Sequence, residues 1–219
     1  MNDRTRELKG VNEKLEKLAM NDSLTGLPNR FCIQNRLNNL FIEAKRDKSI
    51  FTVVMMDLDR FKDINDTLGH DCGDQLLIEV GLRLKEILRP SDFLGRLGGD
   101  EFAILLTETD ENNAKSVARK IQSALEPSFY LSEMAFSVSA SIGIATYPQH
   151  GSTPSTILKS ADVAMYYAKQ NKLDFFIYNP GADRNTPDRL SLMSELRQAI
   201  HENQLELFYQ PEIDIATSR

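Results

Sequence analysis

The sequence predicts an α/β sandwich in which helices flank a mixed, mainly antiparallel sheet. Segments with apolar residues every three or four positions, typical of helices, alternate with short β-branched runs, typical of strands. The run 50–56 is apolar apart from one Thr, as in a strand buried on both faces. The resulting order is helix, strand, helix, hairpin, helix, strand, helix, strand, which favours a split βαβ arrangement. At roughly 150 residues per domain, the 219 residues correspond to about one and a half domains.

The composition excludes several classes of protein. The chain has 32 acidic and 26 basic residues, so it lacks the surplus of Lys and Arg with which duplex-binding proteins neutralise phosphates, and we expect no nucleic-acid partner. No apolar run approaches the about 20 residues of a membrane-spanning helix. The two cysteines, Cys32 and Cys72, are too sparse for a disulfide scaffold or a zinc site. We therefore expect a cytoplasmic location, with no membrane segment in this fragment.

The first predicted element is a helix over residues 1–20. Its apolar positions Leu8, Val11, Leu15 and Leu18 follow the spacing of two coiled-coil heptads. Two heptads are marginal alone. The helix is therefore interpreted either as an amphipathic helix packed on its own domain or as the end of a dimeric signalling stalk that joins an upstream domain.

Turn formers in residues 22–30 end this helix, and a second helix is expected over about 31–45. The strand 50–56 follows. A polar segment then runs to Gly73, and periodic apolar residues predict a helix over about 74–89.

A hairpin is expected next, with strands over 93–97 and 102–107. Gly98 and Gly99 lie at its tip, where glycine supplies the positive φ that tight hairpins need.

The second half of the pattern contains two helices and two regions of strand. Helices are expected over about 111–125 and 154–171, with strand material over 129–147 between them and a last strand over 175–178.

Acidic residues stand at two places that a hairpin beside the buried strand would bring together. Asp57 and Asp59 follow that strand on one face of it, and Asp100 and Glu101 occupy the hairpin tip. Clustered carboxylates repel one another and attract a cation, and a few hard oxygen ligands suit Mg²⁺ shared with substrate phosphates. The alternative is that Asp57 or Asp59 caps the next helix and that the hairpin acids are solvated turn residues.

Five segments resemble the motifs of one family. Arg96–Phe102 (RLGGDEF) resembles the signature of the GGDEF family, the diguanylate cyclases. Four further segments resemble its other motifs in the same order: Asp22–Arg30, Asp57–Asp66, Gly69–Asp74 and Ala161–Lys169. The resemblance implies a ferredoxin-like nucleotidyl-cyclase palm over residues 21–180.

The implied reaction condenses two GTP into cyclic di-GMP and releases two pyrophosphates. The resemblance implies two Mg²⁺ or Mn²⁺ ions per active site, which would stabilise the attacking and leaving oxygens. By motif position, Asp57, Asp100 and the carbonyl of Leu58 are metal ligands. Asp100 and Glu101 are the implied catalytic residues, with Glu101 at the metal or at the attacking hydroxyl.

Four residues match the family's substrate-binding positions. Asn65 and Asp74 would read the guanine edge, since an amide donates and accepts and a carboxylate accepts from the guanine N–H groups. Lys62 and Lys169 would contact phosphates as point charges. The alternative for Asp74 is an N-cap of the helix over 74–89, and the two roles are compatible.

One position departs from the family's pattern. Leu173 stands where the family has an Arg that contacts phosphate, and the loss of a charged hydrogen bond costs about 1–3 kcal/mol. Lys172 is a candidate substitute. The departure favours a second reading, a weak or inactive module that binds GTP or cyclic di-GMP and regulates a phosphodiesterase domain.

A product site is implied at Arg89 and Asp92, which have the spacing and position of the family's RxxD inhibitory site. An Arg fork fits phosphate and guanine edges. The alternative is a helix end stopped by Pro90, where Arg89 interacts favourably with the helix dipole.

The C-terminal segment Leu205–Ile213 resembles the first strand of an EAL phosphodiesterase domain. Residues 181–219 are therefore expected to be a linker and the incomplete start of that domain. The expected partners are GTP, the product cyclic di-GMP, a second copy of the chain for catalysis, an upstream sensory domain and the downstream EAL domain.

Overall fold

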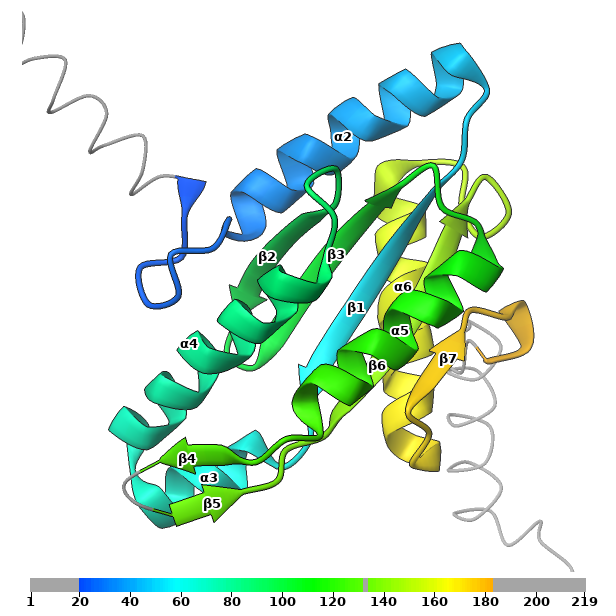
Figure 1. The fold of residues 1–219 in the computed structure, drawn as a ribbon. Coiled ribbons are helices and arrows are strands. Elements are labelled where there is room, and N and C mark those ends of the chain that lie inside the picture. The colour runs from blue at the N-terminus through cyan, green and yellow to red at the C-terminus, as the bar shows by residue number, and fades with distance from the viewer. Residues whose placement is uncertain (1–19, 132–133, 183–219) are drawn as a thin grey trace, which may run out of the picture. The chain divides into compact units, whose positions relative to one another are not determined.

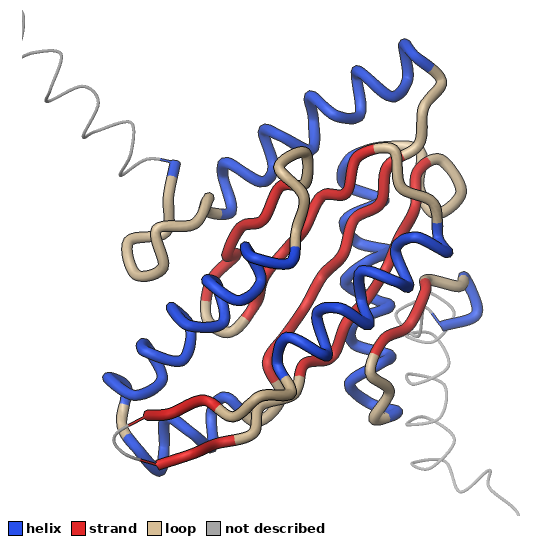
Figure 2. Tube along the Cα trace, in the orientation of Figure 1, coloured by secondary structure: helices blue, strands red, loops and turns tan. Residues whose placement is uncertain are grey.

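The computed structural model describes residues 20–131 and 134–182, in which helices pack on a five-stranded sheet (Figures 1 and 2). The helices are α2 (Arg30–Asp47), α3 (Phe61–Leu68), α4 (His70–Ile87), α5 (Glu111–Leu125) and α6 (Pro154–Asn171), followed by the 3₁₀ turn η1 (Pro180–Ala182). The strands are β1 (Phe51–Leu58), β2 (Phe93–Gly98), β3 (Glu101–Thr107), β4 (Phe129–Leu131), β5 (Met134–Phe136), β6 (Ala140–Tyr147) and β7 (Phe175–Ile177).

The central sheet has the order β2-β3-β1-β6-β7. β1 is antiparallel to both β3 and β6, and β7 adds to the edge parallel to β6. β3 lies between β1 and β2, and β1 lies between β3 and β6, so the crossovers from β1 to β2 and from β3 to β6 are each split by another strand, whereas β6 and β7 are direct neighbours. The predicted sandwich with a mixed, mainly antiparallel sheet and split βαβ topology is confirmed.

All eight residues of β1 are buried, and the two faces of the strand belong to two layers of core. Val54 and Met56 pack in the cluster that contains the buried residues of α4 and α5. Val53 and Met55 pack in the cluster that contains those of α2 and α6. Figure 1 shows α4 and α5 in front of the sheet and α6 behind it. Since strand residues alternate between faces, Asp57 belongs to the α2–α6 side.

The polar segment after β1 folds into helix, contrary to expectation. Phe61 is buried and Ile64 and Leu68 are half-buried, a spacing of three and four residues that gives α3 an apolar face. This stripe has three members in an otherwise polar segment, which explains why periodicity did not predict it. The N-cap position of α3 is Arg60, which makes no side-chain capping hydrogen bond, so the interpretation of a strand-end aspartate as the cap is wrong.

α4 also begins earlier than predicted. Its first residue is His70 and its N-cap is Gly69. Asp74 therefore lies inside the helix, exposed on its surface, and the interpretation of Asp74 as an N-cap is wrong.

The predicted strand region over 129–147 is divided. β4 and β5 pair with each other as a separate two-stranded sheet, and β6 alone enters the central sheet. This hairpin is inserted between α5 and β6.

Two predicted segments fall outside the described residues: the helix over 1–20, apart from its last residue, and the linker with the incomplete EAL domain beyond Ala182. The chain divides into two units, Met1–Ala182 and Asp183–Arg219. In the part of the chain that is described, none of the helices is both long and apolar enough to cross a membrane.

Candidate active site

The acidic end of β1 and the tip of the β2–β3 hairpin lie side by side. In the register of β1 with β3, Asp57 is directly opposite Glu101, so both side chains lie on the α2–α6 side of the sheet. The Leu58 amide donates a hydrogen bond to the Asp100 carbonyl oxygen at 3.3 Å. The hairpin thus brings together the acidic residues that were predicted from the sequence to lie close to one another.

Lys169, near the end of α6, pairs with Asp57. Its Nζ lies 2.5 Å from Oδ1 of Asp57. α6 can approach the sheet closely because Gly143 of β6 has no side chain. A Cβ at Gly143 would lie 2.1 Å from both the Ala161 carbonyl oxygen and the Met165 amide nitrogen. This close packing of α6 positions the Lys169 ammonium at the end of β1.

The pair does not balance the charge at this end of the sheet. Burial raises the pKa of the Asp57 carboxyl above 3.8, and the charges of Asp100 and Asp59 add to the rise, while Lys169 opposes it. Burial lowers the pKa of Lys169, but the hydrogen bond and charge of Asp57 outweigh it, so this pKa is raised and the side chain is cationic. The surplus of carboxylates over cations attracts a further positive ion.

Arg30, a residue that sequence reasoning did not assign to the site, holds Glu101. Its Nη2 lies 3.3 Å from Oε2 of Glu101, and its Nε donates to the Leu97 carbonyl oxygen at 3.2 Å. Arg30 is the first residue of α2. The available signal was its place at the end of the motif Asp22–Arg30, because a contact across 71 residues has no local periodicity.

Asp162 of α6 is a second acidic residue that sequence reasoning did not assign. Burial raises the pKa of Glu101, and the charges of Asp162, Asp57 and Asp100 add to the rise, whereas Arg30 opposes it. Burial also raises the pKa of Asp162 itself. Arg30 opposes this rise as well, so its charge acts on two carboxyl groups from different elements.

The hairpin tip is fixed by Arg96. Its Nη1 donates to both carboxylate oxygens of Asp22, at 2.9 and 3.0 Å. Its Nε and Nη2 donate to the Gly99 carbonyl oxygen, at 3.0 and 2.8 Å. Gly98 and Gly99 have φ values of 137° and 54°, which the absence of a Cβ permits. These contacts hold the residue before Asp100 in place.

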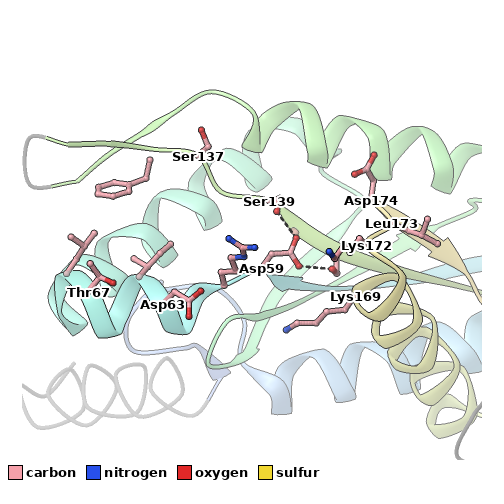
Figure 3. A pocket seen from close by; sticks show the side chains of 15 residues that line it. Asp59, Asp63, Thr67, Ser137, Ser139, Lys169, Lys172, Leu173 and Asp174 are labelled. Atoms are coloured by element: carbon pink, nitrogen blue, oxygen red, sulfur yellow. Dashed lines mark hydrogen bonds between the residues drawn. The ribbon is translucent and has the colours of Figure 1, made fainter.

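Asp59 lies at the edge of a hollow of about 800 Å³ (Figure 3). Its carboxylate accepts hydrogen bonds from the hydroxyls of Ser139 and Ser141, both at 2.7 Å. The hollow is bounded by one face of α3, by the strand segment before β6 and by the end of α6, with Arg60, Asp63, Ile64, Thr67, Leu68, Phe136, Ser137, Ala140, Lys169, Lys172, Leu173 and Asp174 completing its lining. The phosphate-binding candidate Lys169 is therefore shared between Asp57 and this hollow.

The guanine-binding candidates lie on two neighbouring helices, Asn65 on α3 and Asp74 on α4. Asn65 packs so closely on Gly73 that a Cβ there would lie 1.9 Å from the Asn65 Oδ1. This contact places Asn65 beside the turn of α4 that carries Asp74. Lys62, on the exposed surface of α3, does not belong to the lining of the hollow.

Arg89 and Asp92 form a turn between α4 and β2. The Arg89 amide donates to Oδ2 of Asp92 at 3.0 Å, and the Asp92 amide donates to the Arg89 carbonyl oxygen at 3.0 Å. β2 then runs to Gly98, so at about 3.3 Å per residue the turn is roughly 17 Å of strand from the hairpin tip. The pair thus lies at the opposite end of β2 from the acidic residues.

The oxygen atoms at the end of β1 are candidate ligands of a metal ion. Among residues 20–131 and 134–182, no group of three or more acidic, His or Cys side chains is arranged to hold one. A site here would instead consist of the Asp57 and Asp100 carboxylates and the Leu58 carbonyl, with its other ligands from substrate phosphates, as Mg²⁺ commonly has. The mutual charge repulsion of these acids fits such an ion.

Comparison with known proteins decides the family. Residues 19–174 match the family described as "Diguanylate cyclase, GGDEF domain". The chain belongs to the GGDEF family. The segments that resemble its motifs therefore belong to one GGDEF domain. The family membership expected from the sequence is confirmed.

The GGDEF domain is similar to several studied proteins. MucR of Pseudomonas aeruginosa, a bifunctional diguanylate cyclase/cyclic di-GMP phosphodiesterase, is 40% identical over 204 residues, which is 93% of this chain and 30% of MucR. PdeR of Escherichia coli, a cyclic di-GMP phosphodiesterase, is 38% identical over 208 residues, which is 94% of this chain and 31% of PdeR. The structure of an N-terminally truncated TpbB from P. aeruginosa that comprises only the GGDEF domain superposes with a TM-score of 0.72 at 40% identity, covering 75% of this chain and 97% of that one. This chain thus spans about a third of the relatives MucR and PdeR.

Proposed function

We propose that this GGDEF domain condenses two GTP molecules into cyclic di-GMP and releases two pyrophosphates. The observation that carries the proposal is the pairing of Asp57 with Glu101 across β1 and β3, with the Asp100 main chain bonded to Leu58. This arrangement supplies a compact set of oxygen atoms at the end of the sheet. A substrate with several phosphates and divalent cations fits a site whose own charge is negative.

In this proposal Asp57, Asp100 and the Leu58 carbonyl hold Mg²⁺ or Mn²⁺. Each active site contains two such ions, counting those that bind together with the nucleotide. When bound, such ions stabilise charge on the attacking and leaving oxygens of the phosphoryl group. Glu101 and Asp100 orient the attacking 3′-hydroxyl and accept its proton. The raised pKa of Glu101 suits a proton acceptor that must work near neutral pH.

Substrate recognition is assigned to four residues around the acidic end of the sheet. Asn65 and Asp74 read the guanine edge from α3 and α4, and the contact of Asn65 with Gly73 supports this because it places the two side chains on adjoining helices. Lys169 and Lys62 contact phosphates. The pairing of Lys169 with Asp57 supports its role, since an ammonium beside a metal-binding carboxylate also lies beside the metal-bound phosphates.

Each protomer holds one GTP in this proposal, so the reaction requires a homodimer in which two sites face each other. Binding both nucleotides in fixed orientation converts a bimolecular encounter into an effectively intramolecular one. Arg89 and Asp92 are the proposed product site, which inhibits the cyclase when cyclic di-GMP accumulates. Their exposed turn, some distance along β2 from the acidic residues, is compatible with regulation from outside the active site.

The second candidate is a weak or inactive module that binds GTP or cyclic di-GMP and regulates a C-terminal EAL phosphodiesterase. Leu173 favours it, because a side chain without charge lines the hollow beside Lys169. A relative named as a cyclic di-GMP phosphodiesterase, PdeR, shares 38% identity with the chain. In both candidates the domain is cytoplasmic and is joined to an upstream sensory domain and a downstream EAL domain.

Turnover and binding together distinguish the candidates. The purified chain is incubated with GTP and Mg²⁺ over a hundredfold range of protein concentration, and cyclic di-GMP is measured by mass spectrometry. The cyclase proposal predicts product whose rate per protomer rises with concentration as dimers form. Calorimetric binding of GTP without any turnover would support the regulatory module, and absence of both turnover and nucleotide binding would contradict both candidates.

A further inference from the structure

The hollow beside Asp59 contains a second lysine, Lys172, in addition to Lys169. Both line the hollow, and Figure 3 shows both side chains extending from the end of α6 toward the Asp59 side of it. Lys169 is paired with Asp57. Lys172 forms no ion pair with any residue in the described ranges 20–131 and 134–182, so its charge is available to a ligand.

The backbone at the end of α6 fixes the position of the Lys172 Cα atom. It is the C-cap of α6, with φ 54° and ψ 43°, and its amide donates to the carbonyl oxygens of Ala168 and Lys169. This left-handed conformation is one that glycine adopts more easily. The following residue, Leu173, is 41% exposed and brings no charge to the hollow.

Five other charged side chains line the hollow, the acidic Asp59, Asp63 and Asp174 and the basic Arg60 and Lys169. Asp59 is already bonded to two hydroxyls, those of Ser139 and Ser141. Lys169 is partly neutralised by Asp57. A polyphosphate carries several negative charges, and a lysine ammonium binds phosphate as a point charge.

We propose that Lys172 is a second lysine for the terminal phosphates of the nucleotide, acting beside Lys169 at the end of α6. The inference rests on the proposed function, because it takes GTP as the ligand of the acidic end of the sheet. It assigns Lys172 to binding of the phosphates and not to the chemical step. Its loss should therefore raise KM for GTP and leave kcat nearly unchanged.

Lys48 provides a matched control. It is the C-cap of α2 with φ 54° and ψ 33°, so Lys48→Met and Lys172→Met remove the same charge from the same backbone conformation. Binding of GTP, of GMP and of inorganic tripolyphosphate is measured by calorimetry in the presence of Mg²⁺. Lys172→Met should weaken the binding of GTP and of tripolyphosphate about tenfold, which is the effect of one charged hydrogen bond. It should leave the affinity for GMP unchanged. Lys48→Met and Lys172→Arg should bind all three within about twofold of the wild type, and Leu173→Arg should restore GTP affinity to Lys172→Met.

The outcomes separate this inference from the proposed function. Wild-type affinities in Lys172→Met, or equal losses in both methionine variants, would overturn the role of Lys172 while leaving the cyclase proposal intact. A loss of GMP binding in Lys172→Met would show disturbance of the whole site and would also overturn it. A wild-type chain that binds neither GTP nor tripolyphosphate would contradict both the role of Lys172 and the proposed function.

Discussion

The Lys169 ammonium lies 2.5 Å from the Asp57 carboxylate and joins the end of α6 to the end of the central strand. Asp57 is buried, with 12% of its side chain exposed, while 43% of the Lys169 side chain is exposed. The ion pair therefore compensates part of the cost of a buried carboxylate. The same ammonium lines the hollow proposed for phosphates, so one residue links the stability of the site with its ligand.

Lys169→Met should lower both stability and activity. It leaves the Asp57 charge buried without its partner, and the expected loss is about 1–2 kcal/mol, below the range for fully buried pairs because Lys169 is half exposed. GTP turnover should fall at least tenfold. Chemical denaturation and the turnover assay measure the two effects, with Lys85→Met on the exposed surface of α4 as the control. Unchanged stability in Lys169→Met would contradict a compensating role for the pair.

Glu101→Gln should abolish activity without loss of stability. Burial and three neighbouring acids raise the pKa of Glu101, so its charge is unfavourable in the folded state, and a neutral amide removes that repulsion. We expect an unfolding temperature equal to that of the wild type or a few degrees higher, since a few tenths of a kcal/mol to 1 kcal/mol corresponds to such shifts. Glu126→Gln, at an exposed position, controls for loss of charge alone. A clearly lower unfolding temperature for Glu101→Gln would show that the Arg30 ion pair stabilises the fold more than repulsion destabilises it.

The response of stability to Mg²⁺ should depend on pH. The carboxyls of Asp57 and Glu101 have pKa values raised from 3.8 and 4.5. Their neutral forms contribute stability that is fully present below those unfolded-state values and is lost as pH rises through the raised folded-state values. A cation that binds the ionised forms should offset that loss.

Thermal unfolding with and without Mg²⁺ at pH 5 and pH 7 tests this linkage. The increase in unfolding temperature on adding Mg²⁺ should be larger at pH 7, because protons compete with the cation at pH 5. Asp57→Asn should lose most of the increase at pH 7. An equal increase at both pH values, or an undiminished one in Asp57→Asn, would mean that Mg²⁺ binds elsewhere.

Gly73→Ala should disturb guanine binding selectively. The added Cβ would lie 1.9 Å from the Asn65 Oδ1, so the amide must move. We expect at least a tenfold loss in GTP affinity, about the effect of one or two hydrogen bonds, and a smaller loss for ITP, which lacks the guanine amino group. Gly81→Ala in the same helix meets the Leu27 Cδ1 at 3.0 Å instead and should leave affinity unchanged. Equal GTP affinity in the Gly73→Ala and Gly81→Ala variants would contradict the assignment of Asn65 to the guanine site.

Much of the fold follows from local sequence patterns. The apolar run that forms β1 and the glycines between β2 and β3 indicated a buried strand beside a hairpin, and this was enough to predict that Asp57 lies near Glu101. α3 was missed because its apolar face consists of Phe61, Ile64 and Leu68 in a polar segment. Periodicity does not detect a stripe of that length.

The partners of the acidic residues could not be predicted from such patterns. Arg30 and Glu101 are separated by 71 residues, and Lys169 and Asp57 by 112. These pairs depend on how α2 and α6 pack on one face of the sheet, which in turn depends on details such as the missing side chain at Gly143. Family resemblance pointed to Lys169, whereas Arg30 and Asp162 became apparent from the packed structure.

The central claim is that the end of β1 forms a metal-dependent site for GTP condensation. The most direct measurement is the amount of cyclic di-GMP formed from GTP and Mg²⁺ by the wild-type chain and by Asp57→Asn at equal concentrations of folded protein. The account predicts product from the wild type and at least a hundredfold less from Asp57→Asn, since metal-ion stabilisation of the transition state is worth several kcal/mol. No product from the folded wild type at high concentration, or equal product from both proteins, would contradict it.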